Sequence, residues 1–470
     1  MKKRFFIVLA IFFSLSSETL LSNDEVKVKK IFEGLDFPVH ISKNEFISNN
    51  SIFVLEHKSG RILEIQNYDD KPQINQDAIL NIELLLSENE NWEQGLNGFT
   101  FSPKFKDDNN IFVSYNNKKN QITISKFKYD DKIKKAPLSS EVKLLVIDRL
   151  PSISDNKPEH NCGTIDFNPK DNYLYACIGD TRVPESSQNI NVLNGKILRI
   201  NPFIDDTPEK NYIAVKENPF IQLEGKPEIL FAGFRNPWNF SFDSETGDIY
   251  IPDVGSEYIE ELNVVKYDDF NNFLNFGAGC FEGSYRIYDK HYDDSLNAEK
   301  ICLKNINNPL IKMVEPKLQY FHDSLIGTNK NYGNSIIGGV VYKNKDSIWH
   351  NHYFFGDLVS NNIWYLDTNK TKNYIGINLL FGDDLDLGLT SITQIDDKLL
   401  ATSYMGSIYE IVLPDKKNYE KSIYNRPIIY SKLYGVDIMN KSSEVIYTSE
   451  SEFYKLLVKI RKFKNKFFGQ

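Results

Sequence analysis

The stretch Ile229–Asn263 reads ILFAGFRNPWNFSFDSETGDIYIPDVGSEYIEELN, and it sets the pattern for the rest of the chain. An Arg-Asn-Pro-Trp turn at residues 235–238 precedes an alternating strand. A tight Asp-Ser-Glu-Thr-Gly-Asp turn then leads to a second strand that ends in Asp-Val-Gly. Short alternating strands joined by such turns predict antiparallel β-structure. The unit also brings a cation and an amide to one strand end and carbonyl oxygens to another, which predicts a site for a polar ligand.

The same pattern of strand, polar or glycine turn, and strand recurs along the chain. Its six occurrences are Ile52–Glu56 with Arg61–Ile65, Ile111–Tyr115 with Ile122–Tyr129, Tyr173–Gly179 with Lys196–Ile200, Ile249–Asp253 with Glu261–Val265, Tyr353–Gly356 with Ile363–Leu366, and Leu399–Ser403 with Ile408–Val412. Their spacing of roughly 45–105 residues is near the blade period of propellers once insertions are allowed. One unit cannot bury both of its faces, so radial packing is expected. We therefore predict an all-β fold, a six-bladed β-propeller over residues 28–412, with a β-sandwich or two β domains as the alternative.

The two ends of the chain differ from this pattern. Residues 1–22 are typical of a secretory signal peptide, because three basic residues precede the apolar run Phe5–Leu15, which is too short to span a bilayer. A buried N-terminal helix is the alternative. Residues 413–470 form a C-terminal extension in which Glu452–Phe468 predicts an amphipathic basic helix. That helix would either dock on the propeller or make a weak, salt-sensitive contact with an anionic surface.

Charge and cysteine content narrow the class of protein. The net charge of −9 argues against a nucleic-acid partner, because phosphate binding requires a basic face. No segment after the signal is apolar enough to span a membrane, so we expect a soluble protein in the periplasm or outside the cell. Four cysteines fit an oxidising compartment and allow three pairings. We favour Cys280–Cys302, which closes a loop, and Cys162–Cys177, which flanks a predicted turn, with two buried thiols as the alternative for the second pair.

Several segments resemble the glucose/sorbosone dehydrogenase family, the soluble quinoprotein sugar dehydrogenases. The matching phrases follow that family's order and include Val54–Ile65 (VLEHKSGRILEI), Glu93–Phe105 (EQGLNGFTFSPKF), His160–Asp180 (HNCGTIDFNPKDNYLYACIGD), Gly195–Pro202 (GKILRINP), Gly233–Asn239 (GFRNPWN) and Asn275–Gly283 (NFGAGCFEG). The Cys-Phe-Glu-Gly phrase and Tyr353–Asp357 (YFFGD) resemble the hedgehog-interacting-protein-like branch most closely. The resemblance covers the chain from about residue 30 to residue 412.

The resemblance implies a catalytic pair. His160 matches the general base that removes the proton of a sugar C1 hydroxyl while hydride passes to pyrroloquinoline quinone (PQQ). Asp180 matches the carboxylate that orients this base. The residue types agree with these roles, since a histidine of near-neutral pKa suits proton removal and a carboxylate behind it fixes its tautomer. The alternative is that His160 caps a loop and Asp180 caps a turn.

The resemblance also implies a cofactor site. Arg235 and Asn236 match the pair that contacts the quinone carbonyl, where a guanidinium stabilises developing charge. A structural arginine paired with an acidic blade edge is the alternative. Gln94 matches a residue that lines the substrate face, and a turn-stabilising amide is its alternative. Gly255 and Ser256 match positions whose backbone carbonyls bind Ca²⁺. The expected cofactors are thus PQQ and Ca²⁺, the substrate is a sugar, and an external electron acceptor is the partner.

The chain departs from the family where cations from the last two blades should clamp the acidic cofactor. Residues 357–363 read DLVSNNI, and residues 379–393 read LLFGDDLDLGLTSIT, with three aspartates and no Lys or Arg. A buried tricarboxylate needs several cationic partners. The lysines that could substitute are Lys343, Lys345 and Lys370. Trp238 stands where the family often carries a small polar residue, and it would stack on a sugar or quinone or fill the blade core.

Three functions remain open. The first is an exported oxidoreductase that oxidises the C1 hydroxyl of an aldose with hydride transfer to PQQ. The second is a non-catalytic, glycan- or protein-binding propeller that has lost the quinone clamp. The third is a calcium-dependent lactonase-like hydrolase, by fold analogy. A Lys or Arg of residues 340–412 near Arg235 would support the first, whereas an acidic cavity there would count against it.

Overall fold

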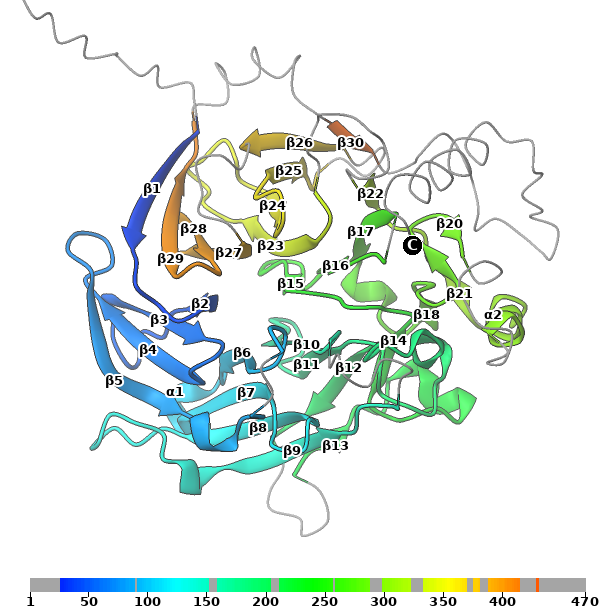
Figure 1. The fold of residues 1–470 in the computed structure, drawn as a ribbon, viewed down its shortest axis with the longest axis horizontal. Helices are drawn as coiled ribbons and strands as arrows, with labels where there is room; N and C mark the ends of the chain where they lie inside the picture. Colours follow the sequence, from blue (N-terminus) through cyan, green and yellow to red (C-terminus); the bar gives the residue numbers. More distant parts are fainter. Residues whose placement is uncertain are drawn as a thin grey trace, which may run out of the picture.

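The computed structural model describes most of the chain, and nearly all of its regular structure is strand (Figure 1). The described residues are 26–88, 91–151, 159–203, 211–256, 258–287, 298–322, 333–369, 375–380, 388–414 and 428–430. The described helices are α1 (Phe105–Asp108), α2 (Ala298–Ile306) and the 3-10 helices η1 (Glu83–Leu85), η2 (Leu138–Ser140), η3 (Pro184–Gln188), η4 (Pro219–Leu223) and η5 (Tyr267–Asp269). Within these ranges, no helix has both the length and the apolar character needed to cross a membrane.

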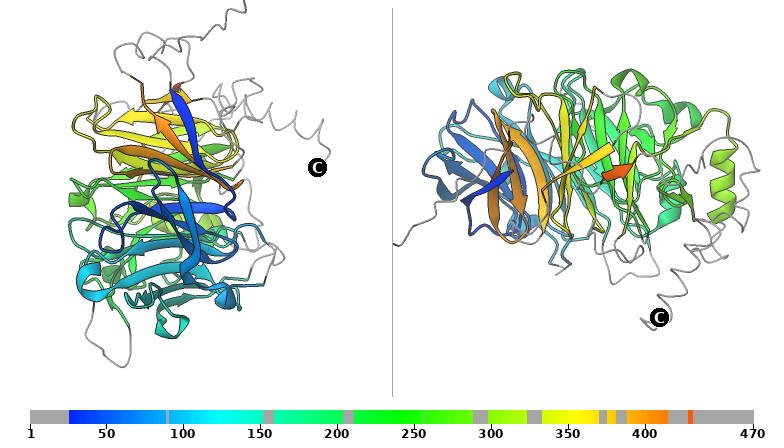
Figure 2. Two further views of the ribbon diagram at one scale, coloured as in Figure 1. Left: turned by 90° about the vertical axis from the view of Figure 1, so that its left-hand side faces the viewer. Right: turned by 90° about the horizontal axis from the view of Figure 1, so that it is seen from above.

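The strands form an all-β propeller whose sheets follow one another around a common centre (Figures 1 and 2). The first two sheets are β2 (Pro38–Ser42), β3 (Ser51–Glu56), β4 (Arg61–Gln66) and β5 (Gln73–Asn81), and then β6 (Leu96–Phe101), β7 (Asn110–Asn116), β8 (Ile122–Lys128) and β9 (Val142–Ile147). The third contains β10 (Cys162–Phe167), β11 (Leu174–Ile178), β12 (Lys196–Asn201) and β14 (Ile229–Ala232), with β13 (Ile213–Ala214), β18 (Leu274–Asn275) and β21 (Lys312–Met313) added.

The remaining strands complete the ring. A nine-stranded sheet contains β15 (Ser241–Phe242), β16 (Ile249–Asp253), β17 (Ile259–Val265), β22 (Leu318–Phe321), β30 (Ile428–Tyr430), β26 (Ile375–Leu380), β25 (Ile363–Asp367), β24 (His352–Asp357) and β23 (Ile336–Tyr342). The last large sheet contains β1 (Lys27–Phe32), β29 (Ser407–Val412), β28 (Lys398–Ser403) and β27 (Leu389–Ile395), and β19 (Phe281–Glu282) pairs with β20 (Tyr285–Arg286). Because β1 pairs with β29, strands from the two ends of the propeller close the ring in one sheet.

The prediction of six separate blades is wrong for the described structure, which has five sheets of four or more strands. The reason is β30, which pairs with β22 through Gln319 and with β26 through Ile375. This strand joins two four-stranded runs, β15-β16-β17-β22 and β26-β25-β24-β23, into one sheet. All of the strand pairs expected from the sequence pattern are present as antiparallel pairs.

The hydrophobic core lies between neighbouring sheets, because no single sheet can bury both of its faces. One cluster joins Phe53 of β3 to Phe99 of β6, and another joins Ile124 of β8 to Ile165 of β10. In the nine-stranded sheet, the rings of Tyr250 and Tyr353 stack with their centroids 4.4 Å apart. Fully burying one large apolar side chain stabilises a fold by about 1.5–3 kcal/mol, so these interfaces hold the ring together.

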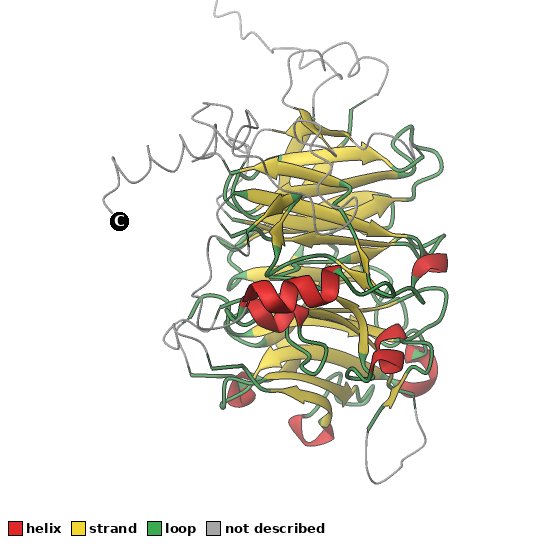
Figure 3. Ribbon diagram, turned by 90° about the vertical axis from the view of Figure 1, so that its right-hand side faces the viewer, coloured by secondary structure: helices red, strands yellow, loops and turns green. Residues whose placement is uncertain are grey.

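The disulfides Cys162–Cys177 and Cys280–Cys302 confirm the favoured cysteine pairing. The second bond fastens α2, which lies at the outer edge of the propeller (Figures 1 and 3). The predicted signal peptide and the amphipathic helix at Glu452–Phe468 lie outside the described residues, and the division into three segments stays a prediction.

Candidate functional site

His160 and Asp180 form a buried pair where β10 begins and β11 ends. In this antiparallel pair Cys162 lies opposite Ile178. His160, two residues before one strand, is therefore brought beside Asp180, two residues after the other. Nδ1 of His160 lies 2.6 Å from Oδ1 of Asp180. The structure thus brings together the two residues that the sequence suggested as base and orienting carboxylate.

Asp180 is held in its charged form. Burial raises the pKa of its carboxyl, but the His160 ring and the Arg235 guanidinium more than offset this, so the pKa lies below its ordinary value. The backbone N–H of Arg182 donates to the same carboxylate over 2.8 Å. With Asp180 ionised, Nδ1 of His160 acts as the donor and Nε2 is left able to accept a proton.

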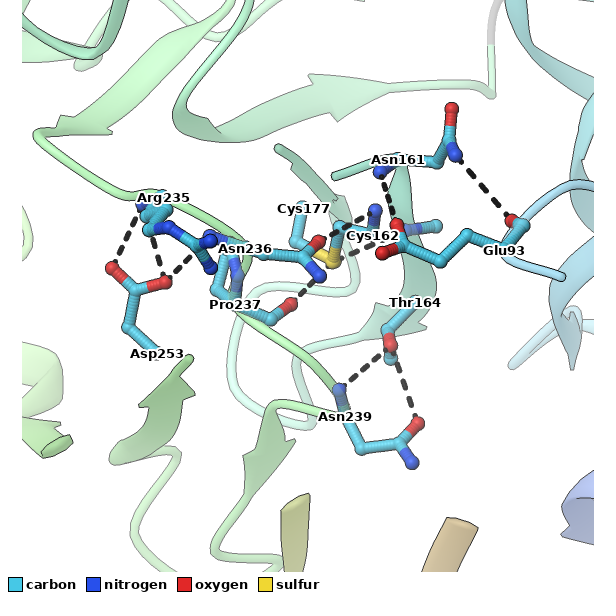
Figure 4. Close-up of a disulfide and its surroundings, with 11 residues drawn as sticks. Glu93, Asn161, Cys162, Thr164, Cys177, Arg235, Asn236, Pro237, Asn239 and Asp253 are labelled. Carbon is cyan, nitrogen blue, oxygen red and sulfur yellow. Dashed lines mark hydrogen bonds between the residues drawn. A yellow bond between two sulfur atoms is a disulfide. The ribbon is translucent and has the colours of Figure 1, made fainter. Parts of the chain in front are cut away.

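The Arg-Asn-Pro-Trp turn is anchored by Asp253 at the end of β16 (Figure 4). The Asp253 carboxylate accepts the backbone N–H of Arg235 over 2.9 Å and that of Asn236 over 2.7 Å. The guanidinium of Arg235 does not bond to Asp253 but donates to the carbonyl of Val254 over 3.0 Å. The backbone carbonyl of Arg235 accepts the N–H of Asp180 over 2.8 Å, so the turn is tied directly to the histidine pair.

Glu93 is a site residue that the sequence analysis did not single out. Its buried carboxylate accepts the backbone N–H groups of His160 over 2.5 Å and of Asn161 over 3.3 Å (Figure 4). Burial raises the pKa of this carboxyl. His160 has a left-handed φ of +56°, so its loop needs such anchoring. The position of Glu93 directly before Gln94 in the family phrase was the signal available in the sequence.

A cavity of about 150 Å³ opens beside this group, and we call it the acidic cavity. Its polar lining consists of His160, Asp180, Arg182, Arg235, Asp253, Gly255, Ser256, Glu261 and Glu282. Four carboxyl groups therefore face two guanidinium groups. One of these cations is already engaged, since Arg182 Nη1 lies 2.5 Å from the Glu159 carboxylate. Burial raises the pKa of Glu261 to about 7.

Gly255 and Ser256, the residues of the predicted calcium site, line the acidic cavity. A Cβ at Gly255 would lie 1.9 Å from the carbonyl oxygen of Ile259, so only glycine allows these two backbone segments to approach so closely. Among the described residues, no group of three or more His, Cys, Asp or Glu side chains is arranged to hold a metal ion. A calcium site here would therefore depend on carbonyl oxygens.

A second cavity, of about 40 Å³, shares Val254 with the first, and we call it the aromatic cavity. It is lined by Val39, His57, Trp92, Glu93, Asn236, Trp238, Val254, Ser335, Ile337, Leu358, Thr390 and Tyr404. Leu358 and Thr390 come from the two stretches in which the family would place cations. Trp238 donates its indole N–H to the Thr390 carbonyl over 3.2 Å and packs against two core clusters, so it fills this space.

The substitute cations suggested by the sequence do not reach either cavity where the structure describes them. Lys343 lies 2.9 Å from the Asp243 carboxylate and 3.1 Å from that of Glu245. Lys345 also lies near Glu245, and Lys370 falls outside the described ranges. The described residues therefore do not fit PQQ. Its carboxylates would meet four carboxyl groups in the acidic cavity or a small apolar space beside Trp238.

Gln94 is buried, but it does not line either cavity. Its carbonyl accepts a hydrogen bond from Lys58 Nζ over 2.6 Å, and Ser87 donates to its side-chain oxygen over 3.4 Å. Among the described residues its Nε2 has no hydrogen-bond partner. The structure therefore places Gln94 beneath the loop of Glu93, apart from the pair formed by His160 and Asp180.

The fold is an all-β propeller, and the two cavities lie beside the ends of its strands. A sequence model of the "Glucose / Sorbosone dehydrogenase" family matches residues 35–273, so the chain belongs to this family. The Arabidopsis thaliana HIPL2 protein is 32% identical over 243 residues, which are 48% of this chain and 31% of that protein. The human Hedgehog-interacting protein is 22% identical over 259 residues, which are 48% of this chain and 36% of that protein. The matches thus span about a third of the length of these curated relatives.

Solved structures share the fold. A crystal structure of glucose dehydrogenase matches with a TM-score of 0.62 and 16% identity, over 82% of this chain and 99% of that chain. The apo form of the soluble aldose sugar dehydrogenase from Escherichia coli matches with a TM-score of 0.61 and 15% identity, over 82% and 99%. The PQQ-bound aldose sugar dehydrogenase from Streptomyces coelicolor matches with a TM-score of 0.54 and 17% identity, over 83% and 98%. At these identities the likeness establishes the fold alone.

Proposed function

We propose that this chain is an exported glycan-binding propeller of the glucose/sorbosone dehydrogenase family that does not use PQQ. The observation that carries the proposal is the acidic cavity beside His160 and Arg235. Its carboxylates and guanidinium groups accept and donate hydrogen bonds of the kind that sugar hydroxyls make. A neutral sugar meets no charge repulsion there, whereas the carboxylates of PQQ would. The name of the human Hedgehog-interacting protein agrees with a binding role, and the two disulfides agree with export.

Calcium belongs to this proposal. The carbonyl oxygens of Gly255 and Ser256 would bind the ion, and Asp253, Glu261 and Glu282 supply negative charge around the cavity. Ca²⁺ accepts irregular sets of oxygen ligands, including the hydroxyls of a sugar. We therefore expect calcium to strengthen glycan binding.

Isothermal titration calorimetry tests the proposal directly. Purified protein, with and without Ca²⁺, is titrated with neutral sugars and then with PQQ. We expect calcium-dependent sugar binding that survives His160→Ala, because binding requires the cavity and not a base. Binding of PQQ in place of sugars would contradict the proposal.

A quinoprotein sugar dehydrogenase is the second candidate, and the pairing of His160 with Asp180 is the observation that favours it. In that case His160 would accept the sugar hydroxyl proton, Asp180 would stabilise the resulting imidazolium, and Arg235 and Asn236 would face the hydride acceptor. Its test is the reduction of an artificial dye by aldoses in the presence of PQQ and Ca²⁺. Activity that His160→Ala abolishes would establish it, and no dye reduction across a broad aldose panel would exclude it.

A further inference from the structure

We infer that the aromatic cavity and the rings around its mouth form a second carbohydrate subsite, so that the ligand is an oligosaccharide and not a free monosaccharide. This inference rests on the proposed glycan-binding function and specifies its ligand. One sugar ring would occupy the acidic cavity, and the next ring would stack on the aromatic rim, which we define as Phe37, Trp92 and Tyr404.

The aromatic rim is assembled from three distant parts of the chain. The hydroxyl of Tyr404 donates to the backbone carbonyl of Trp92 over 2.9 Å. Nε2 of His57 lies 2.9 Å from the same carbonyl oxygen. The rings of Phe37 and Tyr404 are in contact, with centroids 4.5 Å apart and a tilt of 44°. The hydroxyl of Tyr404 thus holds the loop that carries Trp92, although the Trp92 indole is not buried.

Exposure and backbone strain distinguish this rim from ordinary core packing. Trp92 is 50% exposed and Phe37 is 37% exposed, while the neighbouring Met405 is 65% exposed. Phe37 also has a left-handed φ of +52°, which is uncommon and strained for a bulky residue. Trp92 and Tyr404 line the aromatic cavity, and the Phe37 ring contacts Tyr404. Several exposed aromatic rings gathered at one cavity point to a ligand.

The two cavities are adjacent. Val254 lines both of them, and Glu93, which lines the aromatic cavity, accepts the backbone N–H of His160 with its carboxylate. The two cavities are therefore neighbours that share the wall formed by Val254. Linked sugar rings have the matching chemistry, since each ring has an apolar face that stacks on an aromatic ring and hydroxyls that reach polar groups such as Glu93 and Ser335.

Chain-length dependence tests the inference. The full mature protein is titrated in Ca²⁺ with neutral monosaccharides (glucose, xylose, mannose) and with their β-1,4-linked and α-1,4-linked tetramers. We expect at least one tetramer to bind about tenfold more tightly than its monosaccharide, which corresponds to about 1.4 kcal/mol. Trp92→Ala should remove this difference and leave monosaccharide binding unchanged, whereas Trp92→Phe should retain most of it.

The control variant is Phe46→Ala, which removes a ring that is 62% exposed in the β2–β3 turn, at the opposite end of β3 from His57. It should leave all affinities unchanged. Equal affinities for monosaccharides and tetramers, or a tetramer preference that survives Trp92→Ala, would overturn the second subsite while leaving the proposed function in place. Absence of binding by any of these sugars would overturn both.

Discussion

Asp253 and Glu261 lie directly opposite each other in the antiparallel pair of β16 and β17, and both side chains are buried. Burial raises the pKa of each carboxyl, and the charge of Glu261 raises that of Asp253 further. Two buried acids at such a position do not ionise together without strong repulsion. A hydroxyl-bearing ligand or a cation relieves that repulsion, whereas a ligand with carboxylates of its own increases it.

The first prediction concerns pH and stability. Glu261 has an ordinary pKa of 4.5 and a folded pKa of about 7, so the folded protein binds its proton more tightly than the unfolded chain does. The resulting stabilisation is complete below the unfolded pKa and is lost as pH rises through about 7. In calcium-free buffer, Glu261→Gln should therefore flatten the fall in thermal stability across this range, measured by scanning calorimetry. The exposed control Glu217→Gln should show the same fall in thermal stability with pH as the unsubstituted protein. The same fall in Glu261→Gln would contradict the raised pKa of Glu261 as its cause.

The second prediction concerns the anchor of the histidine loop. Glu93→Ala removes the carboxylate oxygen Oε2 that accepts the N–H groups of both His160 and Asn161. Leaving a buried donor unsatisfied costs about 1–3 kcal/mol, so the free energy of unfolding should fall by at least this amount in denaturant titrations. Glu88→Ala is the matched control, since Glu88 is exposed in the same loop. Equal stability of the two variants would show that the anchor is unimportant.

The third prediction concerns Cys162–Cys177, which closes a loop with a sequence separation of 15. Loss of a cross-link of this size costs about 3 kcal/mol in the chain-entropy model. The double variant Cys162→Ala, Cys177→Ala should lose about this much stability in denaturant, although the backbone N–H of residue 162 can still donate to Asn236. Unchanged stability would contradict the structural role of the bond beside the site.

The sequence pattern was sufficient to predict the strand pairs, because alternating apolar residues identify the strands. The pairing of His160 with Asp180 was implied by the family resemblance, and the antiparallel pairing of Cys162 with Ile178 explains it. Contacts between distant segments could not be predicted this way. Strand β30 joins two runs of strands through backbone hydrogen bonds that any residue could form. The contact between Phe37 and Tyr404 likewise depends on how the ring closes, and no local pattern encodes it.

The site could be predicted only in part for the same reason. Arg235, Gly255 and Ser256 do line one cavity. The lack of cations in residues 357–363 and 379–393 was visible in the sequence, but the four carboxyl groups of the acidic cavity come from separate strands and loops. Their convergence appears only in three dimensions.

The central claim is that the site beside His160 accepts neutral glycans and rejects PQQ. The most direct measurement is equilibrium dialysis of the mature protein in Ca²⁺ against PQQ, run in parallel with the tetrasaccharides. The account predicts bound tetrasaccharide and no retained PQQ. Stoichiometric retention of PQQ, with sugar-dependent dye reduction that His160→Ala abolishes, would contradict it.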